Sequence, residues 1–348
     1  MSFLRDKNVP DFRRKGLNFS KLILNSKISP KAASLAVLGC FEYMRKNIKN
    51  SLYIFFGILI LLNILAWITI YDLSKPRFLE VIFFDIGQGD AIFIETPQRH
   101  QILIDGGPSP KILEKLGKEL PFYDRSVDLI ILTHPDPDHL NGLVEVLKSY
   151  KVDLVAFNGA KGTNPAFAEF EKQILKKHIP VAILYGGKKI RVGNKISLDI
   201  LAPFESFEGK EVRDFNTSSI VARLVFGENE FLFTGDAPKS IEKELSQSDI
   251  NLESDILKVS HHGSKTSTTD IFLEKVLPEI AVISVGANKE VKNPDCDNKE
   301  RNKYGHPHCE VLERLAKYDI TVLRTDEVGD IKIISDGAIL KSKIKNQK

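Results

Sequence analysis

Two histidines and two aspartates stand within six residues, in the segment His134 to His139 (HPDPDH). The segment follows the apolar run 127–133, which predicts a strand buried on both faces and ending at the edge of a sheet. Prolines 135 and 137 are expected to keep the backbone extended or turned, so that alternate side chains enter one cavity. Two carboxylates this close repel each other, and buried imidazoles and carboxylates stay desolvated, unless a cation joins them. We therefore predict a site for two divalent ions, Zn²⁺ or Mn²⁺.

Two later segments end in the same way. Residues 231–236 (FLFTGD) read as an apolar strand followed by the carboxylate of Asp236. Residues 255–260 read as a strand followed by His261 and His262, which cannot both point into the same core. Each segment alone is equally compatible with an ordinary turn. Three such strand ends in one chain predict a metal centre.

The elements that must position these residues alternate along the chain. Apolar runs of strand length are separated by turns and by segments with apolar residues at three- and four-residue spacing. Three strands come first and then strands alternate with helices, which favours two packed sheets covered by helices over one doubly wound sheet in this α/β (α+β) domain. The expected strands are 78–86, 91–96, 101–105, 127–133, 152–157, 181–185, 196–201, 219–226, 230–234, 255–260, 280–285, 320–325 and 330–335, and the expected helices are 111–120, 140–150, 166–177, 239–246, 269–277 and 309–317.

An uncharged stretch, 51–71, is long enough to cross a bilayer core. The buried helix of a soluble protein is the alternative, but such helices rarely lack charge over so many residues. Tyr53, Trp67 and Tyr71 near its ends suit the membrane interface. No small-residue cleavage site follows, so we expect an anchor rather than a signal peptide. The predicted organisation is a basic N-terminal segment 1–50, a transmembrane helix 51–71, a linker 72–77 and a globular domain 78–348 that carries the metal centre.

Charge predicts how this chain is oriented in the membrane. Residues 1–50 carry eleven Lys and Arg against three Asp and Glu, whereas the whole chain has 49 and 46, so residues 51–348 are net −5. The positive-inside bias then places the N-terminus in the cytoplasm and the domain outside the cytoplasmic membrane. In that oxidising location Cys296 and Cys309 are predicted to form a disulfide, with two free thiols as the alternative.

The chain resembles the metallo-β-lactamase superfamily, and within it the extracytoplasmic hydrolase domain of the ComEC family of DNA-uptake proteins. The likeness covers residues 78–335 and rests on FDIGQGDA (84–91), LIDGG (103–107), THPDPDHLNG (133–142), FTGD (233–236), LKVSHHGSKTS (257–267) and YGHPH (304–308). It implies an αββα sandwich with the metals at one edge.

Carried over residue by residue, the resemblance implies a set of six ligands. Most of the superfamily has His where this chain has Asp136, a harder ligand that shifts preference from Zn²⁺ toward Mn²⁺. The usual third ligand of the first site has no obvious counterpart, and His178, Asn216 and Thr217 are the candidates for its place. The first metal is assigned to His134 and Asp136, the second to Asp138, His139 and His262, and the bridge to Asp236.

Residues around the ligands receive roles of their own. Asp138, His261 and Asp236 are the predicted catalytic residues, and His261 is expected to donate to a substrate oxygen or protonate the leaving group. Asp105 is expected to orient a ligand. The remaining candidates form a turn at residues 85–90, which we call the signature turn, contact substrate, or lie near the place of the missing ligand. They are Asp85, Gln88, Asp90, Asn216, Ser264 and His306, and for His306 a packed loop is the alternative.

The predicted substrate is a phosphodiester. The resemblance implies a nuclease acting on incoming DNA, and one predicted span implies a separate polytopic channel subunit as partner. The −5 balance opposes DNA binding, but the cations Lys188, Lys189, Arg191, Lys258 and Lys265 are expected to offset it locally. A cell-envelope phosphodiesterase resembling phosphorylcholine esterase, and a catalytically weak binding module of an uptake channel, are the alternatives. A lactamase or thioesterase is disfavoured because those relatives usually keep His at position 136.

Overall fold

The computed structural model describes residues 30–74, 77–193, 195–286, 291–292, 300–301 and 304–344. The chain divides into two compact units, Met1–Pro76 and Arg77–Lys348.

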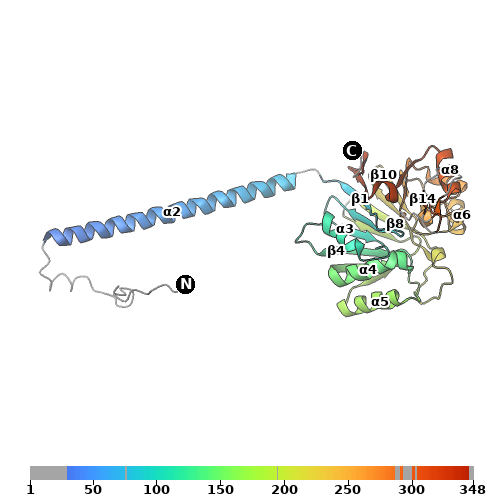
Figure 1. Ribbon diagram of the computed structural model, residues 1–348, viewed down its shortest axis with the longest axis horizontal. Helices are drawn as coiled ribbons and strands as arrows, with labels where there is room; N and C mark the ends of the chain where they lie inside the picture. Colours follow the sequence, from blue (N-terminus) through green and yellow to red (C-terminus); the bar gives the residue numbers. More distant parts are fainter. Residues whose placement is uncertain are drawn as a thin grey trace. The chain divides into compact units, whose positions relative to one another are not determined.

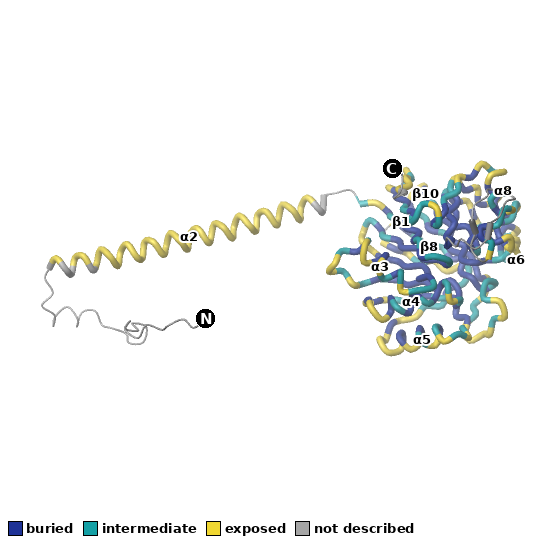
Figure 2. The backbone as a smooth tube through the Cα atoms, viewed as in Figure 1, coloured by how far each residue is buried: buried dark blue, intermediate teal, exposed yellow. Residues whose placement is uncertain are grey.

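The first unit contains one long helix, α2 (Pro30–Ser74). Its stretch Val37–Tyr71 has a mean hydropathy of 2.4 and is long and apolar enough to cross a membrane. Its side chains are exposed wherever they are described (Figure 2). The helix runs without a break past residue 50, where the sequence predicts a boundary between a basic segment and the span. Most of that basic segment, 1–29, lies outside the described residues.

The second unit is built on two large sheets. The first has the order β17-β16-β1-β2-β3-β4-β5-β6 and the second the order β15-β12-β11-β10-β9-β8-β7. A separate two-stranded ribbon pairs β13 (Val291–Lys292) with β14 (Glu300–Arg301). The strands of the large sheets are β1 (Leu79–Phe83), β2 (Ile92–Glu95), β3 (Gln101–Ile104), β4 (Ser126–Leu132), β5 (Lys151–Phe157), β6 (Val181–Ile183), β7 (Lys189–Val192), β8 (Ile196–Ala202), β9 (Val221–Phe226), β10 (Asn229–Phe233), β11 (Ile256–Lys258), β12 (Ile280–Ile283), β15 (Thr321–Arg324), β16 (Ile331–Ser335) and β17 (Leu340–Ile344).

Helices cover the outer face of each sheet, which gives four layers (Figure 1). One apolar core lies between the sheets, where Val81 and Ile102 of the first share a cluster with Leu198 and Phe231 of the second. The helices are α3 (Lys111–Glu119), α4 (Pro137–Ser149) and α5 (Pro165–Lys177) on the first sheet, α6 (Lys239–Gln247), α7 (Asp270–Val276) and α8 (Cys309–Lys317) on the second, and the short α9 (Thr325–Val328), η1 (Phe215–Ser218) and η2 (Ser260–Gly263). The predicted αββα sandwich is confirmed.

Helix α4 begins earlier than the sequence predicts. Pro137 is its first residue and Asp136 its N-cap, so Asp138 and His139 lie in the first helical turn. Proline is favoured there because its missing N–H would have no partner in any case. The prediction that alternate residues of the HPDPDH segment face the cavity is therefore wrong for this pair, since two consecutive residues both reach the site.

Strand direction brings distant segments to one edge. In the first sheet β3 runs parallel to β4, and in the second β10 runs parallel to β11. The residues that follow these strands therefore lie at the carboxyl ends of the strands, at one edge of the sandwich. All three histidine- and aspartate-bearing strand ends of the sequence lie at this edge, which we call the catalytic edge.

Candidate metal centre

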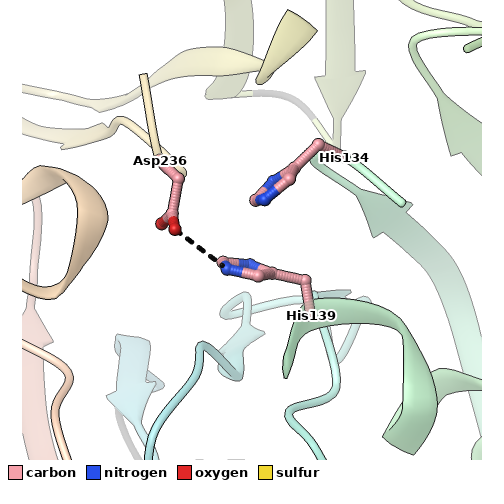
Figure 3. A group of neighbouring side chains, drawn as sticks. All are labelled: His134, His139 and Asp236. Carbon is pink, nitrogen blue, oxygen red and sulfur yellow. Dashed lines mark ion pairs between the residues drawn. The ribbon is translucent and has the colours of Figure 1, made fainter. Parts of the chain in front are cut away.

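Five side chains from both sheets converge at the catalytic edge. His134 follows β4, and Asp138 and His139 open α4. Asp236 follows β10, and His262 lies in η2 after β11. His134, His139 and Asp236 form one group whose ligand atoms all lie within 4.8 Å of one another, and Asp138, His139 and His262 form another (Figure 3 shows the first). The distance from His262 Nε2 is 3.4 Å both to Asp138 Oδ2 and to Asp236 Oδ2.

Hydrogen bonds at Nδ1 fix the rings of the three histidines. His139 Nδ1 lies 2.8 Å from Asp105 Oδ2, and His262 Nδ1 lies 2.9 Å from the carbonyl oxygen of Ser284. Both acceptors lack a hydrogen, so each Nδ1 is the donor. His134 Nδ1 lies 3.0 Å from the Thr133 hydroxyl, whose own proton goes to Asp105. Each imidazole therefore turns Nε2 toward the shared space, as in metal-binding histidines.

The atoms that face this space have no other partner. The Nε2 atoms of His134, His139 and His262 and Oδ1 of Asp236 are buried, and none has a hydrogen-bond partner among the described residues. Buried polar atoms are rarely left unpaired, because each costs about 1–3 kcal/mol. Nitrogen and carboxylate donors in such groups are the ligands that Zn²⁺ and Mn²⁺ accept. The residues present therefore fit divalent metal ions.

Charge in the cluster leads to the same conclusion. Burial lowers the pKa of His139, but the carboxylates of Asp236 and Asp105 raise it well above its usual value. Burial also lowers the pKa of His262, but the carboxylates of Asp236 and Asp90 raise it to about 10. Burial raises the pKa of Asp236, but His262 and His139 lower it well below its usual value. The negative charge of the carboxylates thus favours positive charge in the cluster, and metal ions would supply it in place of protons on the histidines.

The centre also includes a buried lysine, which the sequence did not predict to lie there. Lys258, the last residue of β11, is 0% exposed and forms an ion pair with Asp90. Its Nζ lies 3.8 Å from Asp236 Oδ1 and donates to the carbonyl oxygen of Gly235 at 3.0 Å. Asp90 in turn lies 3.4 Å from His262 Nδ1. The expectation that Lys258 offsets charge toward DNA is wrong, because its ammonium group is enclosed among the site carboxylates.

Two glycine positions let the backbone approach the ligands closely. A Cβ on Gly89, whose φ is +135°, would collide with the carbonyl of Asp138, and the N–H of Asp90 donates to that same carbonyl at 3.3 Å. A Cβ on Gly142 of α4 would collide with the carbonyl of Gly106, next to Asp105. The first contact holds the turn 85–90 against the N-terminal turn of α4, and the second holds the segment after β3 against the same helix.

The first site is less complete than the second. Asp136 Oδ2 lies 3.5 Å from His134 Nε2, but among the described residues Asp136 joins no group of three ligands within 4.8 Å. Asn216 lies in η1, close in the chain to Ser219, whose hydroxyl accepts from the N–H of Asp236. Its Oδ1 is buried without a hydrogen-bond partner in the described part of the chain. His178, by contrast, is the C-cap of α5, before β6 and at the end of the sheet opposite the catalytic edge.

The remaining predicted residues divide between the centre and its surroundings. Asp85 is not brought to the cluster; it is part-exposed and pairs with Lys111 at 3.4 Å. Gln88 Oε1 accepts from the N–H of Gly286 at 3.5 Å and so ties the signature turn to the segment after β12. Ser264 is buried, and its hydroxyl accepts from the hydroxyl of Thr266 at 3.0 Å.

His261 and His306 form the open side of the centre. The His261 side chain is 26% exposed, and its Nε2 lies 3.9 Å from Asp236 Oδ2. Its Nδ1 lies 3.1 Å from the Thr266 hydroxyl. Burial lowers the pKa of His261, against the opposing effect of Asp236. The His306 ring lies 5.5 Å from that of His261, and burial, with the nearby His262 and His261, lowers the His306 pKa to about 3.

The predicted disulfide falls partly outside the described residues. Cys309 is disulfide-bonded and Cys40 is free. Cys296 lies in a segment that is not described. The pairing of Cys296 with Cys309 stays a prediction.

The sequence of this chain is similar to those of several bacterial proteins. ComE operon protein 3 of Bacillus subtilis is 32% identical over 270 residues, 73% of this chain and 32% of that protein. Recombination protein 2 of Haemophilus influenzae is 30% identical over 318 residues, 89% of this chain and 35% of that protein. Competence protein ComA of Neisseria gonorrhoeae is 29% identical over 254 residues, 72% of this chain and 32% of that protein.

The chain thus spans about one third of the length of the curated relatives that it matches. Residues 84–287, which contain every ligand candidate discussed above, match the model of the metallo-beta-lactamase superfamily. This chain belongs to the metallo-beta-lactamase superfamily.

Proposed function

We propose that this superfamily hydrolase is a membrane-anchored, metal-dependent phosphodiesterase that cleaves DNA during its uptake. The observation that carries the hydrolytic part is the convergence of three unpartnered Nε2 atoms and an Asp236 carboxylate oxygen in one buried space. DNA as substrate is supported by similarity to proteins named for competence and recombination. The apolar helix α2 supports the anchor. The eleven Lys and Arg of residues 1–50 favour an N-terminus in the cytoplasm and a domain outside.

The centre is proposed to hold two ions, Zn²⁺ or Mn²⁺. His134 and Asp236 would hold one, with Asp136 as a further ligand, and Asp138, His139 and His262 would hold the other. When bound, two such ions activate water and neutralise the charge that develops on the phosphoryl oxygens. Asp105 keeps Nδ1 of His139 protonated and Ser284 does the same for His262, so neither ring can turn its Nε2 away.

His261 is proposed to move a proton during catalysis. Thr266 donates its own hydroxyl proton to Ser264, so it accepts from Nδ1 of His261. Nε2 of His261 is then left with a lone pair beside Asp236, on the partly exposed side of the centre. A positioned imidazole of this kind contributes about 10²–10⁴-fold to a rate. His306 packs beside His261, with ring centroids 5.5 Å apart.

The test uses the full chain reconstituted in lipid nanodiscs. Labelled single- and double-stranded DNA is incubated with the protein and Mn²⁺ or Zn²⁺, alongside bis(p-nitrophenyl) phosphate and a phosphorylcholine-bearing envelope polymer. We expect DNA cleavage that Asp138→Ala and His262→Ala reduce more than about 100-fold. His178→Ala is the matched control, because this histidine lies at the opposite end of the domain and should leave the rate unchanged.

Other outcomes assign another function. Turnover of the small diester or the polymer without DNA cleavage would replace DNA by an envelope phosphodiester. Absence of all turnover with about two ions bound per chain would make the domain a binding module. A separate polytopic channel subunit is the proposed partner, and co-purification of a polytopic protein with the full chain tests it.

A further inference from the structure

We propose that the end of the domain opposite the catalytic edge docks on an anionic bilayer surface. This end, called the far end, is where β1, β4, β5, β6 and β12 begin. The proposal depends on the membrane anchor proposed above and does not depend on hydrolysis.

Exposed apolar side chains gather at the far end. The five most exposed large apolar side chains of the second unit, among its described residues, are Phe122 (89%), Tyr123 (75%), Leu175 (73%), Leu277 (63%) and Ile339 (57%). Phe122 and Tyr123 lie in the connection before β4, and Leu175 lies in the last turn of α5, before β6. Leu277 is the C-cap of α7, before β12, and Ile339 lies in the turn that joins β16 to β17. Exposed apolar groups clustered at one end mark an interaction surface.

Phe122 and Tyr123 are suited to a membrane interface in particular. Their rings meet edge to face with centroids 5.3 Å apart, at the tip of the connection between α3 and β4. Tyrosine is enriched at the headgroup level of bilayers, where its ring is apolar and its hydroxyl is wet, and phenylalanine adds apolar area beside it. Nothing in the described part of the domain covers this pair.

A basic hollow lies beside the aromatic pair. It has a volume of about 530 Å³ and is lined by Arg125, Lys151 and Lys177, with Tyr150 between them. Arg125 donates to the Tyr150 hydroxyl at 3.2 Å, and Lys177 donates to the carbonyl oxygen of Tyr150 at 3.2 Å. Among the described residues, a carboxylate pairs with only one of these three cations, Lys151, through Asp153. The excess positive charge suits an anionic lipid headgroup.

The short connection between α2 and β1 limits the distance between the far end and a membrane that holds α2. Helix α2 ends at Ser74, and the second unit starts at Arg77, two residues before β1. Three residues span at most about 10 Å when extended. A membrane that holds α2 is therefore tethered to the end of the domain at which β1 begins. By contrast, β4 is seven residues long, so the catalytic edge lies about 23 Å farther along the strand.

Fluorescence quenching tests the docking directly. Trp67 is the only tryptophan, so the Trp67→Phe background can carry Phe122→Trp or, as a matched control, Ile271→Trp. Ile271 is 42% exposed and lies in the first turn of α7, after the catalytic edge. The full chain is placed in nanodiscs containing brominated phospholipids with phosphatidylglycerol. We expect quenching at position 122 to exceed that at position 271 by at least about two-fold.

The basic hollow has its own control. Lys151→Glu should reduce the quenching at position 122, whereas Lys210→Glu, which changes another exposed lysine paired with one carboxylate, should not. Replacing phosphatidylglycerol by phosphatidylcholine should weaken the effect in the same way. Equal quenching at positions 122 and 271, no response to Lys151→Glu, or failure of the full chain to enter the bilayer would each overturn the proposal. An inactive enzyme that still shows the expected quenching would overturn the proposed function alone.

Discussion

The ammonium group of Lys258 pairs with the carboxylate of Asp90, and both side chains are closed off from solvent. Asp90 also lies 3.4 Å from His262 Nδ1, so the pair connects the signature turn to a candidate metal ligand. A buried charge that loses its partner costs far more than the pair itself contributes.

We therefore expect Lys258→Met to destabilise the protein severely. Asp90 would remain buried without its lysine partner and with only histidines beside it, at a cost of about 3–5 kcal/mol in the free energy of unfolding, measured with urea. The double variant Asp90→Asn/Lys258→Met should recover part of that loss, because it removes both charges. A double variant no more stable than Lys258→Met would show that this pairing does not carry the effect.

Asp105→Asn should weaken metal binding without unfolding the domain. Asp105 accepts from the N–H and hydroxyl of Thr133 and from Nδ1 of His139, and an amide of the same size cannot keep all three bonds. Loss of such a partner typically lowers metal affinity about 10–100-fold. Competition titration with a metal indicator measures it. Asp85→Asn is the control, and an equal loss of affinity there would contradict the assignment.

Removing metal should lower the melting temperature. A ligand present at about 100 times its Kd stabilises the folded state by about 2.7 kcal/mol, and a chelator abolishes that contribution. Thermal scans of the full chain with and without EDTA measure the shift. The His262→Ala variant should show a much smaller shift, because a group of candidate ligands is then incomplete. A shift as large as that of the unmodified chain would place the stabilising ion elsewhere.

Asp270 should make stability depend on acid pH. A hydrogen bond from Lys317 lowers the Asp270 pKa, so the unfolded state binds more protons than the folded state between the two pKa values. The contribution of Asp270 is therefore present above its unfolded pKa of about 3.9 and is lost as the pH falls through the lower folded value. Because the group is exposed, Asp270→Asn should cost no more than about 1 kcal/mol at pH 7. Urea unfolding of both forms at pH 7 and at acid pH measures this; a difference that grows on acidification would contradict the assignment.

Much of the fold follows from local patterns. The apolar run before His134 predicts β4, and the three- and four-residue spacing in 166–177 predicts α5, because burial on one or two faces leaves a distinct period in the sequence. The start of α4 was missed because Pro137 suits a turn as well as a first helical turn. The edge strands β7 and β17 were not predicted, because their lysine, arginine and serine residues leave no continuous apolar run.

The candidate centre was predictable only in part. His134, Asp236 and His262 could be singled out because each follows an apolar strand. Lys258 could not, since one lysine in a strand carries no sign of its partner and Asp90 is remote in sequence. Nor does the sequence show that Asp85 is part-exposed and pairs with Lys111 whereas Asp90 is buried beside Lys258.

The division of the ligands between two sheets has a consequence for the nascent protein. His134, Asp138 and His139 belong to the first sheet and its helix, whereas Asp236 and His262 arrive about a hundred residues later with the second. A chain that has folded only its first sheet still lacks the candidate ligands Asp236 and His262. The candidate metal centre can therefore be complete only after the second sheet has folded against the first.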